Sequence, residues 1–202
     1  MDLCIVGWYY VPTFYDTILD WTLKRRSAVV VTHREPTLPL PCPSIIEPNI
    51  GLEWGAYDAY LRKAWNGKSP VLFMHDDTIV EDSFFQKVEE RCATFDVAFI
   101  FPDAEQARMN GRAHGRCVYM SRETLHRFKG IGFWHDVDNM GDVHSTACNN
   151  GIQHFLMDLR WLQDRRNLTP LVVGCVYVEG ADFGYRGALG EAGAQYRASH
   201  FR

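Results

Sequence analysis

The sequence lacks the short motifs by which several large enzyme classes are recognised. It has no G-x-G-x-x-G after its first apolar run, no G-x-x-x-x-G-K-[ST] and no G-x-S-x-G. A Rossmann-type dinucleotide site, a P-loop and an α/β-hydrolase nucleophile therefore have no support in this chain. Its six cysteines are scattered without a C-x-x-C pair. Several of them lie inside apolar runs, which indicates buried free thiols rather than disulfides or a zinc site.

A net positive charge and a hydrophobic run of membrane-spanning length are also lacking. The formal net charge is −4, which argues against a general nucleic-acid-binding protein with a basic stripe. No apolar run approaches the roughly 18 residues needed to cross a membrane. Asp2 stands where a signal peptide would carry its basic region. We therefore expect a soluble, cytoplasmic protein, and 202 residues with 47% hydrophobic and 23% charged content suit one globular domain.

What the sequence does contain is an alternation of apolar runs and amphipathic stretches. The runs predict strands at residues 3–7, 28–32, 71–74, 96–101, 116–120 and 171–178. Helical spacing predicts helices at residues 13–26, 52–65, 83–92, 121–130 and 152–162. The proline-rich residues 36–48 suggest an extended connector, and no element is expected in the glycine-rich tail. This order predicts an α/β fold with a mainly parallel central sheet and helices on both faces.

The most specific chemical signal lies at residues 69–80. Four apolar residues follow Pro70 without a break, as in a fully buried strand, and the strand ends at Asp76 and Asp77. Ser83 then caps a helix. Open α/β sheets hold their ligands at the carboxyl ends of strands. Adjacent carboxylates repel each other unless a cation lies between them and a phosphate. We therefore predict a divalent-metal site, against the alternative of a solvated Asp-Asp turn.

Residues 4–10, 29–34, 49–51 and 71–77 follow one another as a strand with an aromatic loop, a second strand, an Asn-Ile-Gly segment before a helix, and a hydrophobic strand that ends in acids. On these residues the first half of the chain resembles a glycosyltransferase of the GT-A fold, which is Rossmann-related, and is closest to the inverting family 2 type. The second half is similar only in general layout. Those enzymes have, in this order, a strand, an aromatic or Thr-rich loop, a helix, a strand, an N-x-G segment before a helix, and a hydrophobic strand that ends in an acidic DxD signature. His75-Asp76-Asp77 departs from the common form of the signature. The resemblance implies a Mn²⁺ or Mg²⁺ ion held first by Asp77 and then by Asp76.

The function that the resemblance implies is transfer of a sugar from a nucleoside-diphosphate sugar to a glycan or other hydroxyl acceptor. UDP is the expected nucleotide, on the base rate of this fold. Residues 1–101 would bind the nucleotide sugar and residues 102–202 the acceptor, in a single GT-A-like catalytic domain. An abrupt end after a glycine-rich stretch would suit a domain excised from a longer polypeptide.

Nucleotide contacts are expected where the early strands end. The candidates are Gly7, Trp8, Tyr9, Arg34, Asn49, Gly51 and Asp76. Trp8 or Tyr9 could stack on the base, and Arg34 could meet a phosphate or the base edge. Asn49 and Gly51 precede a helix whose N-terminus favours an anionic ligand. Each candidate has a structural alternative, such as a core aromatic for Trp8 or a turn residue for Asp76.

The resemblance also implies a base for the acceptor hydroxyl, on a loop or helix start well after the metal signature. The acids available there are Asp136, Asp138 and Asp142. Gly141-Asp142 resembles the family's glycine-then-acid pattern, so Asp142 is preferred. A carboxylate in hydrogen-bond reach is sufficient for this role. A retaining enzyme would need no such base.

A histidine near the C-terminus is a further candidate. Many enzymes of this type return a C-terminal histidine to the metal, and His200 would fill that role here. Gly187, Gly190 and Gly193 would let the segment bend over the sheet edge. An imidazole ligand would favour Mn²⁺ over Mg²⁺. The alternative is a frayed terminus.

Two other functions stay open at this point. A sugar-nucleotide nucleotidyltransferase has a related fold, but such enzymes usually carry a glycine-rich loop with Arg or Lys after the first strand. Here that place holds Trp8-Tyr9-Tyr10-Val11. The second alternative is a non-catalytic module that binds a nucleotide sugar or a glycan.

Overall fold

A seven-stranded sheet forms the centre of this computed structural model. The structure describes residues 1–7, 20–33, 35–36, 39–48, 52–76, 78–101, 117–131, 175–179 and 184–188. The strands of the sheet are β1 (Asp2–Gly7), β2 (Val29–Thr32), β3 (Ser44–Ile46), β4 (Val71–His75), β6 (Val97–Phe101), β7 (Cys117–Met120) and β8 (Cys175–Glu179). Their order across the sheet is β3-β2-β1-β4-β7-β6-β8.

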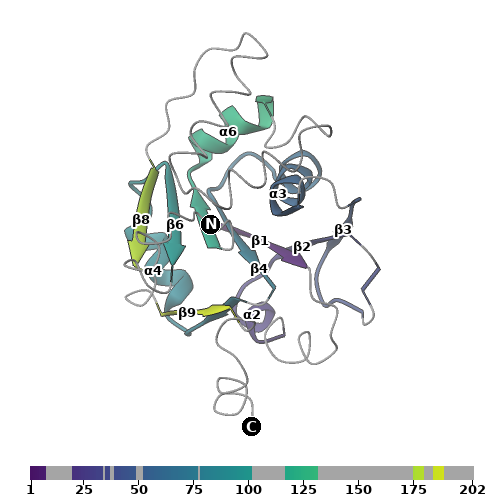
Figure 1. The fold of residues 1–202 in the computed structure, drawn as a ribbon, viewed down its shortest axis with the longest axis horizontal. Coiled ribbons are helices and arrows are strands. Elements are labelled where there is room, and N and C mark those ends of the chain that lie inside the picture. Colours follow the sequence, from purple (N-terminus) through teal and green to yellow (C-terminus); the bar gives the residue numbers. More distant parts are fainter. Residues whose placement is uncertain are drawn as a thin grey trace.

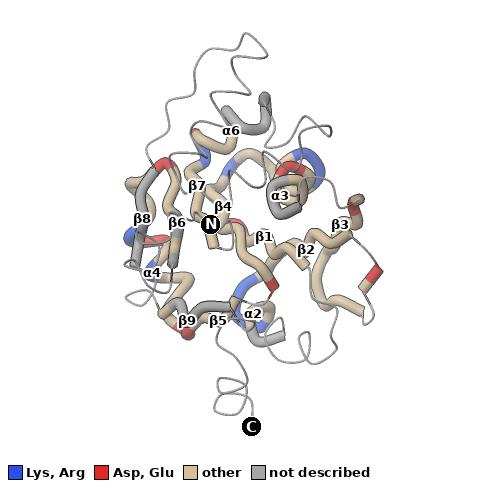
Figure 2. Tube along the Cα trace, in the orientation of Figure 1, with Lys and Arg blue, Asp and Glu red and all other residues tan. Residues whose placement is uncertain are grey.

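The sheet is mainly parallel. β1 pairs in parallel with β2 and β4, β2 with β3, and β6 with β8. Among the described strands of this sheet, β7 alone runs the other way, antiparallel to both β4 and β6. In β1, β2, β4 and β7 the interior positions carry no Lys, Arg, Asp or Glu, and the charged residues that are drawn lie mainly on helices and at strand ends (Figure 2). This arrangement confirms the predicted α/β fold class.

Helices cover both faces of the sheet (Figure 1). They are α2 (Asp20–Arg25), α3 (Leu52–Lys63), α4 (Phe84–Arg91) and α6 (Arg122–Ile131). Because side chains alternate along a strand, Cys4 and Val6 of β1 join the core under α3 and α6. Leu3 and Ile5 join the core under α4. No helix within the described residues is long and apolar enough to cross a membrane.

Local sequence accounts for most helix positions. Phe84, Val88 and Cys92 lie one turn apart and are all fully buried, which is the helical spacing on which the predicted helix at residues 83–92 rests. At α6 the hydroxyl of Ser121 accepts a hydrogen bond of 3.2 Å from the Thr124 amide, as expected of an N-cap. Ser83 differs from expectation: it occupies the N-cap position of α4, but its side chain makes no capping hydrogen bond.

Three short strands were not expected from the sequence. β3 lies within the segment that was predicted as a connector. A strand can form there because residues 44–46 contain no proline, so they can pair with β2. β9 (Tyr185–Ala188) lies in the tail where no element was expected, and it pairs with β5 (Thr78–Val80) in a separate two-stranded sheet. None of these strands contains more than two consecutive apolar residues, whereas the equally short β2 and β7 lie in continuous apolar runs, which is the pattern that predicts a buried strand.

The described cysteine side chains are all free thiols, as predicted. Cys4, Cys92 and Cys117 are buried and Cys42 is half-buried. Burial raises the pKa of Cys92 to about 12 and also raises the pKa of Cys4 and Cys117. These thiols therefore stay protonated at neutral pH and act as small apolar core residues rather than nucleophiles.

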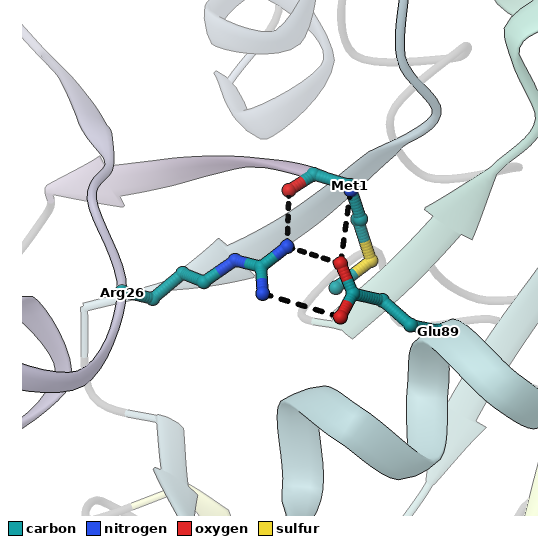
Figure 3. Close-up of polar contacts among 3 residues, drawn as sticks. All are labelled: Met1, Arg26 and Glu89. Carbon is teal, nitrogen blue, oxygen red and sulfur yellow. Dashed lines mark hydrogen bonds and ion pairs between the residues drawn. The ribbon is translucent and has the colours of Figure 1, made fainter.

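A charged cluster joins the start of β1 to α2 and α4 (Figure 3). The Met1 amino group donates a hydrogen bond of 2.9 Å to Glu89 Oε1. The Arg26 guanidinium donates to both carboxylate oxygens of Glu89 and, at 2.5 Å, to the Met1 carbonyl. Burial disfavours the Glu89 charge, but hydrogen bonds from Arg26 and the amino terminus outweigh it and lower the pKa of Glu89.

We expect this cluster to make stability depend on pH in the acid range. Because the pKa of Glu89 is lower in the folded state, the cluster stabilises the fold above the unfolded pKa of about 4.3. That stabilisation is lost as the pH falls through the folded pKa. Urea unfolding of a Glu89→Gln variant from pH 7 to pH 2.5 should show lower stability at pH 7 and a smaller loss on acidification than wild type.

The matched control is Glu123→Gln. Glu123 also has a lowered pKa, but it is well exposed and its partner is the adjacent Arg122, so the substitution should change little at any pH. Equal pH dependence of Glu89→Gln and wild type would contradict the assigned role of the cluster.

Candidate functional site

The strand order identifies one edge of the sheet as the place for a ligand. From β1 the chain goes first to β2 and β3 on one side and later to β4 on the other. The carboxyl ends of β1 and β4 therefore form a topological switch point, where open α/β sheets bind their ligands. Gly7 pairs with Thr32, and Val6 pairs with His75. Gly7 ends β1, Thr32 ends β2, and Asp76 directly follows the end of β4, so the three residues lie at the carboxyl ends of adjacent strands.

Asp76 is the acid that the structure places at this edge. Val71, Leu72, Phe73 and Met74 are at most 1% exposed, so β4 leaves the core only at its end. Asp76 follows in a turn, and its amide donates a hydrogen bond of 3.0 Å to the Val6 carbonyl of β1. The residue is only 3% exposed. Burial of a carboxylate is costly unless nearby charges or hydrogen bonds compensate it. Buried acids in such environments are often found at functional sites.

Thr78 adds a second oxygen close to this turn. The residue is 1% exposed, and within the described part of the chain its hydroxyl oxygen has no hydrogen-bond partner. A buried polar atom of this kind calls for an explanation, of which an ion or ligand is one. Mn²⁺ and Mg²⁺ accept oxygen ligands. The Asp76 carboxylate and the Thr78 hydroxyl, on either side of position 77, therefore fit a divalent cation in their chemistry.

The described residues do not by themselves complete a metal centre. No three His, Cys, Asp or Glu side chains among them gather into a metal-binding group. The remaining predicted ligands, Asp77 and His200, lie outside the described residues. The metal site therefore stays a prediction. Of its three proposed ligands, the structure describes only Asp76.

Gly7 lies at the end of β1, as predicted, next to this acid. A methyl group built on Gly7 would lie 3.4 Å from Val30 Cγ1 and 3.6 Å from Thr32 Cβ. These are close to ordinary contacts, so packing alone does not demand glycine here. Its predicted role as a nucleotide contact is neither confirmed nor contradicted.

The other predicted residues lie outside the described part of the chain. They are Trp8, Tyr9, Arg34, Asn49, Gly51, Asp136, Asp138 and Asp142. Thr32 and Thr78 were not singled out from the sequence, although both are buried at this edge. A threonine next to a strand end is too common to mark a site by itself, and only the strand pairing shows that these two lie there.

Comparisons with known proteins give remote likenesses only. The sequence matches no protein-family model and no curated protein. The structure is similar to a manganese complex of Rv0371C from Mycobacterium tuberculosis, with TM-score 0.47, 10% identity, and 75% of this chain and 86% of that chain covered. The 2-C-methyl-D-erythritol 4-phosphate cytidylyltransferase of Thermus thermophilus gives TM-score 0.45, 14% identity and 95% coverage of both chains.

A third similar structure is a mutant of a Drosophila beta-1,4-galactosyltransferase 7, in complex with manganese, UDP-Gal and xylobiose. It gives TM-score 0.43 and 8% identity, and the match covers 98% of this chain and 74% of that chain. Likenesses this remote do not assign an activity.

Proposed function

We propose that this chain is a divalent-metal-dependent glycosyltransferase. It transfers a sugar from a nucleoside-diphosphate sugar, with UDP favoured, to a glycan or other hydroxyl acceptor. The observation that carries the proposal is the buried carboxylate of Asp76 at the switch point between β1 and β4. The sequence resemblance to the GT-A type adds Asp77 directly after it.

The proposed chemistry follows from the leaving group. A nucleoside diphosphate leaves poorly until its charge is neutralised, and a bound divalent cation supplies that neutralisation. In this proposal Asp77, Asp76 and His200 hold the cation. Gly7, with residues that follow β1 and β2, lines the nucleotide site, in the half formed by residues 1–101. Asp142, in the half formed by residues 102–202, accepts the proton of the acceptor hydroxyl.

A panel of nucleotide sugars tests the proposal. UDP-, GDP-, dTDP- and CMP-sugars are each added to the purified protein, with Mn²⁺ or with EDTA, and the melting temperature is measured. A ligand present at 100 times its Kd stabilises the folded state by about 2.7 kcal/mol. We expect a clear rise with a UDP-sugar and Mn²⁺ and none with EDTA. No rise with any nucleotide sugar would contradict the proposal.

Two activity assays separate the alternatives. Donor hydrolysis that requires Mn²⁺ indicates a transferase, because water replaces the missing acceptor. Binding without hydrolysis or transfer would indicate a non-catalytic module. Release of pyrophosphate from a nucleoside triphosphate and a sugar 1-phosphate would indicate a nucleotidyltransferase instead.

A further inference from the structure

The two-stranded sheet of β5 and β9 lies next to the acidic turn. β5 begins at Thr78, two residues after Asp76, and it pairs antiparallel with β9 far along the chain. Thr78 pairs with Ala188 and Val80 with Tyr185, so β9 carries one extra residue, as in a β-bulge. Bulges often lie beside active sites, where they redirect a side chain.

The acidic turn is therefore held from two sides. On one side the Asp76 amide is bonded to the Val6 carbonyl of β1. On the other side Thr78 is paired with Ala188 of β9. Only position 77 separates these two attachments. Any displacement of β9 would release one of them.

Gly184 fixes β9 at the other end of β5. It is buried in a turn with φ of +85°, a conformation that favours glycine. Its carbonyl accepts a hydrogen bond of 2.8 Å from the Glu81 amide. A methyl group added at Gly184 would lie 2.8 Å from Glu81 Cβ and 2.9 Å from Glu81 Oε2. Because Glu81 Cβ is attached directly to the backbone, it cannot swing away, and the two strands would have to separate.

We propose that Gly184 is a positioning residue. Its close contact with Glu81 keeps β9 paired with β5, and this pairing holds the acidic turn at residues 76–77 in the position that binds the metal. The inference rests on the proposed function, because the turn must bind a cation for the positioning to matter. It also gives a reason why a segment near the C-terminus belongs to the site formed by the first half of the chain.

The test variant is Gly184→Ala, and its matched control is Gly67→Ala. Gly67 also has a positive φ, of +80°, so both substitutions strain the backbone alike. Gly67 lies before β4, at the end of the sheet opposite the acidic turn. A methyl group there would meet only the tip of His126, at 3.2 Å. If Gly184→Ala does not fold, Gly184→Asn takes its place, because asparagine tolerates the left-handed region better.

Mn²⁺ binding in the presence of UDP is measured by calorimetry for each variant. Gly184→Ala should bind Mn²⁺ about 10- to 100-fold more weakly than wild type, as outer-shell substitutions usually do. Gly67→Ala should bind Mn²⁺ as wild type does, although its melting temperature should also fall because of the backbone strain. Adding Glu81→Gly to Gly184→Ala removes the colliding Cβ and should restore part of the affinity.

Amide hydrogen exchange provides a readout that needs no ligand. In Gly184→Ala the Glu81 and Asp76 amides should exchange about tenfold faster than in wild type, because the left-handed conformation is costly for alanine. The Leu72 amide, inside β4, should stay protected. Unchanged exchange at Asp76, or unchanged Mn²⁺ affinity, would overturn the positioning role. A wild-type protein that binds neither Mn²⁺ nor UDP would overturn the proposed function, and exchange would still show whether β9 holds the turn.

Discussion

Asp77→Asn is expected to abolish metal-dependent binding of the nucleotide sugar while leaving the fold intact. Asparagine keeps the size of the side chain but removes one of the few charges that hold a hard cation. The loss should exceed the about 10- to 100-fold that is typical of an outer-shell substitution. Calorimetric titration with Mn²⁺ and a UDP-sugar measures the affinity, and thermal unfolding without ligand checks the fold.

Asp76→Asn should weaken the same binding to a smaller extent. The residue is 3% exposed, and the backbone bond from Asp76 to Val6 does not depend on the carboxylate. The substitution therefore changes the charge of the site but keeps its backbone attachment.

Asp58→Asn is the matched control for a buried aspartate. Asp58 is 4% exposed, but it lies within α3 and its ionic partner is Arg62 on the same helix. Its replacement should lower stability without changing Mn²⁺ affinity. If Asp77→Asn binds the nucleotide sugar with unchanged dependence on Mn²⁺, the metal assignment is wrong. If Asp58→Asn is as damaging to binding as Asp76→Asn, the effect is one of general destabilisation.

The strands that could be predicted from the sequence are those that lie in the hydrophobic core. β1, β4 and β7 are buried on both faces, so their sequences are continuous apolar runs. The direction of β7 is a different matter, because an apolar run has no direction. Whether a strand is parallel or antiparallel depends on the path of the connection before it, and a run of residues such as Cys117–Met120 does not record that path.

The candidate site also has a part that could be predicted from sequence and a part that could not. The place of Asp76 could be predicted, because a carboxylate directly after a buried run must emerge at the strand end. The attachment of the acidic turn to β9 could not, because Thr78 and Ala188 are far apart in sequence and neither is distinctive. Gly184 is conspicuous only once Glu81 is seen to face it. Local patterns predict local elements, whereas a contact between distant backbone segments appears only in the folded chain.

We propose further that Asp142→Asn lowers turnover by about 10²- to 10⁴-fold, the usual contribution of a positioned general base. Donor affinity should stay within a few fold of wild type, because a base acts on the acceptor in the transition state and not on the bound donor. Transfer rates at saturating donor, compared with donor Kd from calorimetry, separate the two effects. Residue 142 lies outside the described residues, so the proposal rests on the sequence resemblance and on this chemistry.

Asp136→Asn and Asp138→Asn are the controls, since both acids belong to the same segment. A base must be deprotonated to accept the acceptor's proton, so kcat/KM of the wild type should fall as the pH drops below the pKa of the base. The variant that lacks the base should lose this acidic limb of the profile, whereas the other two should keep it. If Asp136→Asn or Asp138→Asn loses both turnover and the acidic limb, that residue is the base instead of Asp142. If none of the three matters, the reaction is retaining and needs no base of this kind.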